Sequence, residues 1–205
     1  MAIQDIEHGN GICVIDPHGD IATDLLNYIP KGRLNDLIYF NPKDLSHSIA
    51  FNPLNSVNPN YHSLVASGLI STFKKIWSES WGPRMEHILR FTLLSLLWPP
   101  DATLLDIQPL LTDSAFREGV LSYVKDEYVL AFWEGEFAQY SKTFRNEAIA
   151  PILNKMGIFL ASAPLRAIVG QKARGLRMQE VMNKKKILIC NLSKGELGED
   201  VSALL

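Results

Sequence analysis

Two short polar loops hold the side chains best suited to chemistry. The first is Asp16-Pro17-His18-Gly19-Asp20 and the second is Asn191-Leu192-Ser193-Lys194-Gly195; each follows an apolar run typical of a buried strand. In an open parallel sheet, ligands bind beyond the carboxyl ends of the strands. We therefore expect a ligand to meet the polar side chains of both loops, which are Asp16, His18, Asp20, Ser193 and Lys194.

Two other interpretations of the first loop stay open. Asp16 and Asp20 have a structural alternative, in which they cap the next helix and Asp20 is its N-cap. Asp16, His18 and Asp20 also alternate along an extended segment, which would suit a metal site, although the other histidines show no ligand-like spacing. The phosphate loop Gly-x-x-x-x-Gly-Lys-[Ser/Thr], the dinucleotide motif Gly-x-Gly-x-x-Gly and the Gly-x-Ser-x-Gly nucleophile elbow are absent from the sequence.

The charge of the chain is unevenly distributed. Its 205 residues include 20 basic and 22 acidic ones. Residues 1–140 hold 9 basic and 17 acidic residues, a balance of −8, whereas residues 141–205 hold 11 and 5, a balance of +6. Such a basic segment attracts phosphates or forms a solvated helix face. The composition excludes a disordered tail and a disulfide scaffold, and Cys13 and Cys190, each inside an apolar run, are expected to be buried thiols.

Periodicity divides the chain into three stretches. Residues 1–56 alternate between helix and strand signals, with strands at residues 11–15 and 37–40. Residues 57–170 carry about six helices, with Thr103 and Asp113 as expected N-caps. One of these helices is expected at 126–140 and another at 142–160, which Pro151 should kink or split near Ala150. Residues 171–205 return to a strand at 186–192. The expected fold is α/β, a parallel sheet with packed helices that an all-α domain interrupts.

Several motifs together resemble the HerA/FtsK superfamily of hexameric DNA-translocating ATPases. The nearest branch is that of the TraD/TraG-type coupling proteins of conjugation and type IV secretion. The resemblance begins with Gly-Ile-Cys-Val-Ile-Asp-Pro-His-Gly-Asp and continues, in family order, through these segments: Leu-Ile-Tyr-Phe-Asn-Pro at 37–42, Phe-Asn-Pro-Leu at 51–54, Trp-Gly-Pro-Arg-Met-Glu at 81–86, Ala-Ile-Ala-Pro-Ile-Leu-Asn-Lys at 148–155 and Asn-Leu-Ser-Lys-Gly at 191–195.

The resemblance implies a RecA-like P-loop NTPase core, formed by residues 1–56 and 171–205, with an all-α domain inserted at 57–170. The family's phosphate loop would precede residue 1 and its Walker B carboxylates would follow residue 205, so we expect a central fragment that does not hydrolyse ATP alone. Asp16 would lie on the γ-phosphate side as the catalytic residue. The residues near the nucleotide would be His18, Gly19, Asp20, Ser193 and Lys194.

The resemblance also implies partners. ATP and Mg²⁺ would serve the intact protein, and neither is expected to bind this fragment tightly. DNA, single- or double-stranded, would contact basic residues: Arg84, Arg90, Lys142, Arg145, Lys155, Lys172, Arg174 and Arg177. The intact protein would form a hexameric ring and meet relaxosome or secretion-channel proteins. It would be cytoplasmic, at the inner face of the inner membrane where an N-terminal anchor precedes the fragment.

Three functional hypotheses follow. The first is a segment of an ATP-driven, ring-forming DNA motor. The second is a non-catalytic helical module that docks DNA or protein, and the third is a metallohydrolase that uses Asp16, His18 and Asp20. Four tryptophans could stack on nucleic-acid bases, although their helical spacing among Leu and Phe favours the core: Trp77, Trp81, Trp98 and Trp133.

Overall fold

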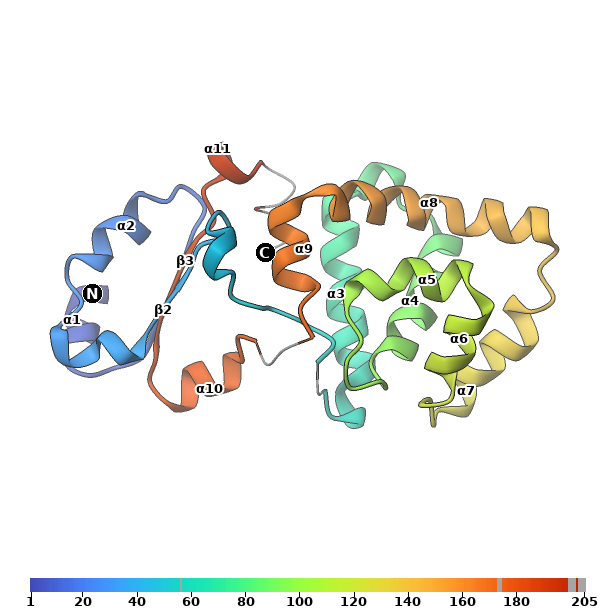
Figure 1. Ribbon diagram of the computed structural model, residues 1–205, viewed down its shortest axis with the longest axis horizontal. Helices are drawn as coiled ribbons and strands as arrows, with labels where there is room; N and C mark the ends of the chain where they lie inside the picture. Colours follow the sequence, from blue (N-terminus) through green and yellow to red (C-terminus); the bar gives the residue numbers. More distant parts are fainter. Residues whose placement is uncertain (56, 173–174, 199–201, 203–205) are drawn as a thin grey trace. The chain divides into compact units, whose positions relative to one another are not determined.

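The computed structural model describes residues 1–55, 57–172, 175–198 and 202. Its chain divides into two compact units (Figure 1). One unit combines Met1–Phe51 with Arg174–Leu205 and contains the strands; the other, Asn52–Ala173, is helical. The helical unit is therefore an insertion between the second and third strands. We refer to them as the sheet unit and the helical unit.

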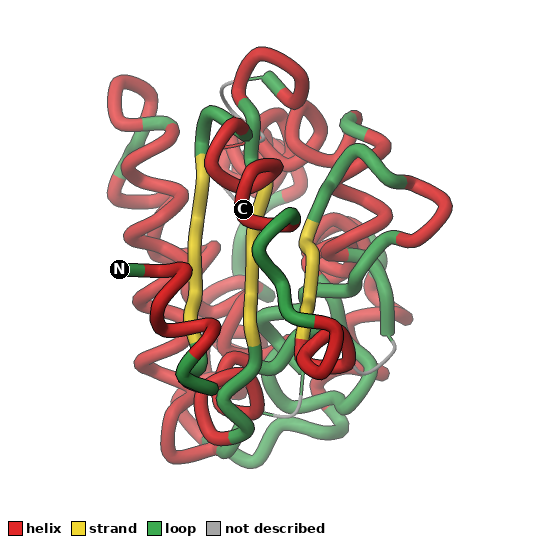
Figure 2. The backbone as a smooth tube through the Cα atoms, turned by 90° about the vertical axis from the view of Figure 1, so that its left-hand side faces the viewer, coloured by secondary structure: helices red, strands yellow, loops and turns green. Residues whose placement is uncertain are grey.

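In the part of the chain that the structure describes, the sheet has three parallel strands: β1 (Ile12–Asp16), β2 (Leu37–Phe40) and β3 (Ile187–Asn191). The spatial order is β1-β3-β2, so β3 lies between the other two (Figure 2). Because β3 is central and its first four residues are buried, it follows the continuous apolar pattern of a parallel strand. In register, Asp16 lies opposite Asn191, which places the ends of β1 and β3 side by side.

Short helices complete the sheet unit. Ile6 of α1, Ala22 and Leu25 of α2, and Ile187 and Ile189 of β3 form a buried core on one face of the sheet. This side of the sheet therefore binds its helices through aliphatic packing. The helices are α1 (Ala2–Glu7), α2 (Asp20–Leu26), α10 (Met178–Asn183), α11 (Lys194–Leu197) and the 3₁₀ turns Lys31–Asp36 and Leu45–His47.

The sheet corrects two expectations. A continuous apolar run predicts that β1 is buried on both faces, but β1 is an edge strand among the described residues and the Ile15 side chain is 62% exposed. Cys13 is exposed as well, so the expectation of two buried thiols is wrong for Cys13 and holds for Cys190. An apolar pattern reports that a strand packs against something, but it does not report that both faces are covered.

The expectation of a RecA-like core interrupted by an all-α domain is also wrong as a description of the fold class. The structure is 62% helical, and its described part contains a small sheet of three strands, which fits a RecA-like core weakly. The motif loops and the strand–helix alternation each cover a short segment and predict a parallel sheet without the number of its strands. They were therefore too local to define the size of the sheet.

Several helices and turns of the helical unit begin at recognisable residues. Pro83 occupies the first turn of α4, Thr103 forms a capping box with Asp106, and Asp113 accepts hydrogen bonds from the first amides of α6. The predicted caps at Thr103 and Asp113 are thus confirmed. The helices are α3 (His62–Ile76), α4 (Pro83–Leu96), α5 (Ile107–Thr112), α6 (Ser114–Leu121), α7 (Glu127–Ala131), α8 (Lys142–Ala161), α9 (Ala163–Val169) and the 3₁₀ turns Pro59–Tyr61, Ser78–Ser80 and Leu104–Asp106.

Two helices differ from the sequence prediction. The segment expected as one helix at 126–140 is α7 followed by a π-helix, Phe132–Phe137. The helix α8 continues through Pro151, so the expected split near Ala150 does not occur. A proline removes one backbone donor from a helix, and in a helix of 20 residues that loss does not end the element.

No single helix in the described ranges is both long and apolar enough to cross a membrane. The segments Lys142–Ile158 and Ala163–Val169 pass that test only when taken together, and they meet at a bend of 103°.

Candidate functional site

The two polar loops predicted from the sequence meet at the carboxyl edge of the sheet. The backbone amide of Leu192 donates to the carbonyl of Asp16 at 2.8 Å, and the amide of Lys194 donates to the carbonyl of Pro17 at 3.1 Å. The loop after β1 and the loop after β3 are therefore joined directly. This is the edge at which parallel sheets bind ligands.

Asp16 is a charged residue buried at this edge, and it is 3% exposed. Its Oδ1 accepts a hydrogen bond from the His18 amide at 2.9 Å, and its Oδ2 accepts one from the Ala22 amide at 2.9 Å. Burial raises the pKa of Asp16, but hydrogen bonds from backbone amides outweigh it and hold the pKa below its usual value. The carboxylate therefore stays ionised and holds the loop against the first turn of α2.

Gly19 has a backbone conformation that the loop requires. Its φ is +95°, and a Cβ at this position would lie 2.8 Å from the Oδ1 of Asn191. That amide side chain is fixed, because its Nδ2 donates to the Tyr39 hydroxyl at 3.0 Å and its Oδ1 accepts from the Ser193 amide at 3.3 Å. A side chain at Gly19 would thus separate the two loops.

The other predicted residues of this edge lie on the surface. His18, Asp20 and Lys194 are exposed and Ser193 is half-buried. The expected N-cap is wrong: Gly19 occupies that position, and Asp20 is the first residue of α2. Asp16, rather than Asp20, binds an amide of the first turn from outside the helix.

A metal site at these residues is not supported by their arrangement. Both carboxylate oxygens of Asp16 accept backbone hydrogen bonds. Among the described side chains, no group of three or more His, Cys, Asp or Glu residues is placed to hold a metal ion. The role that the structure gives to the buried Asp16 carboxylate is to hold the backbone of the loop.

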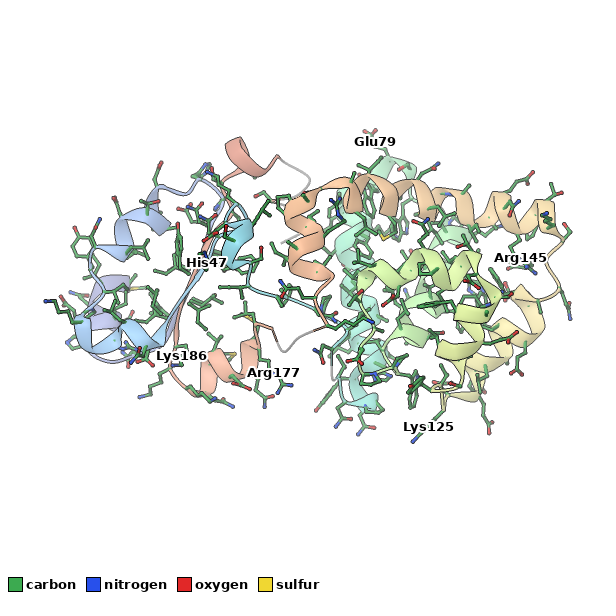
Figure 3. The ribbon with its side chains drawn as sticks, viewed as in Figure 1. His47, Glu79, Lys125, Arg145, Arg177 and Lys186 are labelled. Carbon is green, nitrogen blue, oxygen red and sulfur yellow. The ribbon has the colours of Figure 1, made fainter. Side chains whose placement is uncertain are left out.

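A second polar region of the sheet unit is a cavity of about 300 Å³ near the start of β3. Its basic side chains are partly neutralised: Arg177 and Lys184 pair with Glu180 at 3.6 and 3.0 Å, and Lys186 pairs with Asp36 at 2.8 Å. Figure 3 shows Arg177 and Lys186 in this part of the unit. The cavity therefore has less free positive charge than its sequence suggests.

Three of the predicted DNA-binding residues lie at one end of the helical unit, and the others do not. Arg84 of α4 lies over the ring of Phe144 in α8, with its Cζ 4.8 Å from the ring centroid. Lys142 and Arg145 belong to the first turn of the same α8, so these three cations share one end of the helical unit. Figure 3 marks Arg145 at this end of the helix.

The remaining candidates lie elsewhere. Arg90 is bound to Glu86 and Ser67, each at 3.0 Å. Lys155 follows Arg145 by ten positions on α8, which places it about 15 Å further along the helix. Lys172 lines a mostly apolar cavity of about 310 Å³ in the helical unit. Arg177 belongs to the sheet unit, and Arg174 lies outside the described residues.

Aromatic rings connect the cations at this end of the helical unit. The ring centroids of Phe144 and Tyr140 are 4.8 Å apart, and those of Tyr140 and Phe137 are 5.6 Å apart. Arg145 lies over Phe137 at 5.1 Å, and Arg117 lies over the same ring at 5.3 Å. We call Phe137, Tyr140 and Phe144 the aromatic ladder. Arg117 was missed by sequence reasoning, because nothing in its own segment distinguishes it from a surface arginine.

A carboxylate on the π-helix borders the ladder. Glu136 accepts hydrogen bonds from the Tyr140 hydroxyl and pairs with His87 Nε2 at 3.1 Å. Burial raises the pKa of Glu136, but these hydrogen bonds outweigh it and lower the pKa overall. Burial and the same carboxylate raise the pKa of Tyr140 to about 12, so this hydroxyl remains a donor at neutral pH.

The tryptophans contribute to packing. Trp133 is buried and its Nε1 donates to the Ser95 hydroxyl at 2.8 Å, while Trp81 donates to Glu86 at 2.7 Å. Trp77 and Trp98 are half-buried, and each packs against a neighbouring ring. The partly exposed rings beside the cations of α4 and α8 are therefore those of Tyr140 and Phe144.

Comparisons with protein-family models, with curated proteins and with solved structures gave no match.

Proposed function

We propose that the chain is a segment of an ATP-driven, ring-forming motor that moves DNA, and that its helical unit contacts the nucleic acid. The observation that carries the proposal is the group of Arg84, Lys142 and Arg145 beside the aromatic ladder. Arginine attracts phosphates without regard to sequence, and adjacent aromatic rings favour nucleic acid over other anions. A motor that moves along DNA needs contacts of this sequence-independent kind.

Two further features support the motor proposal. The motif loops after β1 and β3 are joined at the carboxyl edge of a parallel sheet, where a ligand-responsive element would lie. The helical unit interrupts the chain between β2 and β3, so both of its ends are anchored in the sheet unit. A change at the sheet edge could thereby be transmitted through two covalent connections.

Within such a motor, we expect Asp16 to have a structural role. Its carboxylate is used by backbone amides, so we expect it to maintain the loop rather than activate water or bind Mg²⁺. The purified chain is accordingly expected to show no hydrolysis of Mg-ATP. Turnover that disappears in Asp16→Ala, in a variant that remains folded, would contradict this assignment.

DNA binding is tested with fluorescently labelled oligonucleotides of two unrelated sequences, single- and double-stranded, over a series of salt concentrations. We expect log K to fall linearly with log salt, with the same slope for both sequences. Arg84→Met should weaken binding. Lys155→Met also removes one positive charge, about 15 Å along α8 from Arg145, and should leave binding unchanged. A wild-type chain that binds neither strand form, or binds with no salt dependence, would overturn the proposal.

A second candidate is a non-catalytic DNA-docking module, and the commitment of Asp16 to backbone amides favours it. Both candidates predict DNA binding. They differ in the coding sequence upstream of Met1: the motor requires a phosphate loop in the same reading frame, of the form Gly-x-x-Gly-x-Gly-Lys-[Ser/Thr]. A reading frame that lacks this motif would leave the docking module.

A further inference from the structure

Two arginines from different helices share one buried aromatic ring in the helical unit. Arg117 comes from α6 and Arg145 from α8, and their Cζ atoms lie 5.3 and 5.1 Å from the centroid of Phe137. Arg117 also lies 5.8 Å from the ring of Trp133. Phe137 is 1% exposed, so the ring is a fixed support for both guanidinium groups. Two positive charges are thereby held as neighbours.

The positive charge of this pair is not neutralised within the described part of the chain. Neither guanidinium forms an ion pair there, whereas Arg33, Arg90 and Arg177 do. The nearby Asp113 carboxylate accepts the amides of Ala115 and Phe116 at its Oδ1 and forms no ion pair with Arg117 or Arg145 in the described part of the chain. Burial and the charge of Arg145 lower the pKa of Arg117, and Glu118 and Asp113 oppose this only in part. Placing the two cations together thus has an electrostatic cost.

Some of the N–H donors of Arg117 and Arg145 already bind carbonyls at helix ends. Arg117 Nη1 donates to the Leu110 carbonyl at 2.9 Å, at the end of α5, and Arg145 Nη2 reaches the carbonyls of Phe137 and Tyr140 at 3.4 Å. These contacts use one terminal nitrogen of each guanidinium, which has five N–H donors. The Nε of Arg145 is buried without a hydrogen-bond partner. Capping therefore leaves the second terminal nitrogen of each guanidinium without a hydrogen bond in the described part of the chain.

We propose that Arg117 and Arg145 together bind a phosphate of a nucleic-acid backbone. A phosphate between the two guanidiniums would accept charge-assisted hydrogen bonds from both and remove their mutual repulsion. The aromatic ladder leads from this pair through Tyr140 and Phe144 to Arg84, so a strand bound at the pair could continue to a third cation. This inference rests on the proposed DNA contact of the helical unit and names the residues at its centre.

The test uses the full chain and a labelled oligothymidine of about 20 nucleotides, with binding measured over a salt series. The slope of log K against log salt is negative, and its magnitude should decrease by about 0.7 in each of Arg117→Met and Arg145→Met. Binding should also be about fivefold weaker at 0.1 M salt. Arg145→Met also removes a buried unpaired donor and a like-charge contact, so its melting temperature should equal or exceed that of the wild type.

Arg166→Met is the matched control. Arg166 belongs to the same unit and caps helix-end carbonyls, those of Leu160 and Ala161, at 2.6 and 2.8 Å, but it has no aromatic support in the described contacts. This variant should keep the wild-type slope. If both variants of the pair also keep that slope, the pair serves capping only and the inference is overturned, while the proposed function stands. If the wild type does not bind DNA at all, the proposed function fails first.

A second measurement keeps the test decisive if a variant does not fold. In the wild type, the Nε–H resonances of Arg117 and Arg145 can be followed by NMR during titration with the oligonucleotide and, separately, with inorganic phosphate. We expect the two resonances to shift together with the oligonucleotide at micromolar concentrations. Shifts that occur only with millimolar inorganic phosphate would identify a weak general anion site and overturn the assignment to nucleic acid.

Discussion

The amide of Ala22 donates a hydrogen bond of 2.9 Å to the carboxylate of Asp16, six residues earlier in the chain. The same carboxylate accepts from His18, so one buried charge fixes both the loop after β1 and the start of α2. Because the carbonyl of Asp16 also accepts from Leu192, the residue connects this loop to β3. Asp16 thus organises the carboxyl edge of the sheet through backbone contacts.

Asp16→Asn should destabilise the sheet unit. The carboxamide has one acceptor oxygen, and its NH₂ group would face a backbone amide that also donates, so about 1–3 kcal/mol of stability should be lost. All four tryptophans belong to the helical unit and do not report on the sheet. The protection of Cys190, which is buried in β3, provides the readout in a Cys13→Ser background. Its labelling by a thiol reagent should accelerate roughly 5- to 150-fold.

Asp24→Asn is the control for this substitution, because Asp24 is exposed on the same helix α2. An exposed charge of this kind should change stability by less than about 0.5 kcal/mol. DNA binding by the helical unit should be the same in both variants. Equal labelling rates for Asp16→Asn and Asp24→Asn would show that the buried carboxylate is not a structural centre.

Acid should weaken the sheet unit through Asp16. The pKa of Asp16 in the folded chain lies below its ordinary value of 3.8, because backbone amides outweigh the effect of burial. The ionised group therefore contributes stability that is complete above pH 3.8 and is lost as pH falls through the lower folded pKa. Cys190 protection, measured by quenched labelling after incubation between pH 7 and pH 2, should decline in this acid range. Asp16→Asn should remove part of the decline; an identical decline in both proteins would refute the assignment.

Arg33 should stabilise the opposite edge of the sheet. Its Nη1 donates to the carbonyls of Ile6 and Asn10 at 3.0 and 2.7 Å, and its Nη2 donates to the carbonyl of Lys185 at 2.7 Å. One guanidinium thus ties α1, its following turn and the entry to β3. Lysine cannot reproduce this fork, so Arg33→Lys should cost about 2 kcal/mol and raise Cys190 labelling roughly 30-fold.

Lys31→Met provides the comparison, since Lys31 is exposed in the same 3₁₀ turn and its side chain forms no such hydrogen bond with the described residues. Its effect on Cys190 labelling should be less than about twofold. Chemical denaturation followed by tryptophan fluorescence should be unchanged in both variants if the helical unit unfolds independently. If Arg33→Lys leaves the rate of Cys190 labelling unchanged, water replaces the guanidinium at these three carbonyls with no loss of stability, and the prediction is wrong.

The sequence predicted the positions of strands and helix caps better than it predicted what packs against them. The strand at 37–40 was predicted with its observed bounds. Thr103 and Asp113 were correctly identified as caps, since capping depends on residues two or three positions apart. The exposure of Ile15 was not predictable, because an apolar run contains no information about what lies beyond each face. The size of the sheet escaped prediction for the same reason, and local loop motifs were overextended to a RecA-like core.

The candidate sites show the same limit. Proximity of the Asp16 and Asn191 loops followed from the rule that parallel strands end at one edge, and the observed contacts agree with it. The sequence did not predict that both Asp16 oxygens accept backbone hydrogen bonds, because this depends on where the chain turns after Gly19. Arg117 could not be paired with Arg145 from sequence, since the two are 28 positions apart with a π-helix between them and only the packing around Phe137 brings them together.

The two cysteines should differ sharply in reactivity in the folded chain. Cys13 is exposed on the edge strand β1, whereas Cys190 is 7% exposed and its pKa is raised to about 12 by burial and by the neighbouring Cys13. Burial also raises the pKa of Cys13, so at pH 8 it should react more slowly than a cysteine in an unstructured peptide. A thiol reagent monitored by mass spectrometry should therefore modify one site, Cys13, before any modification of Cys190, and Cys13→Ser should abolish this early product. Equal rates at both sites would contradict the edge position of β1, because a further strand or layer over Cys13 would be needed to slow it to the rate of Cys190.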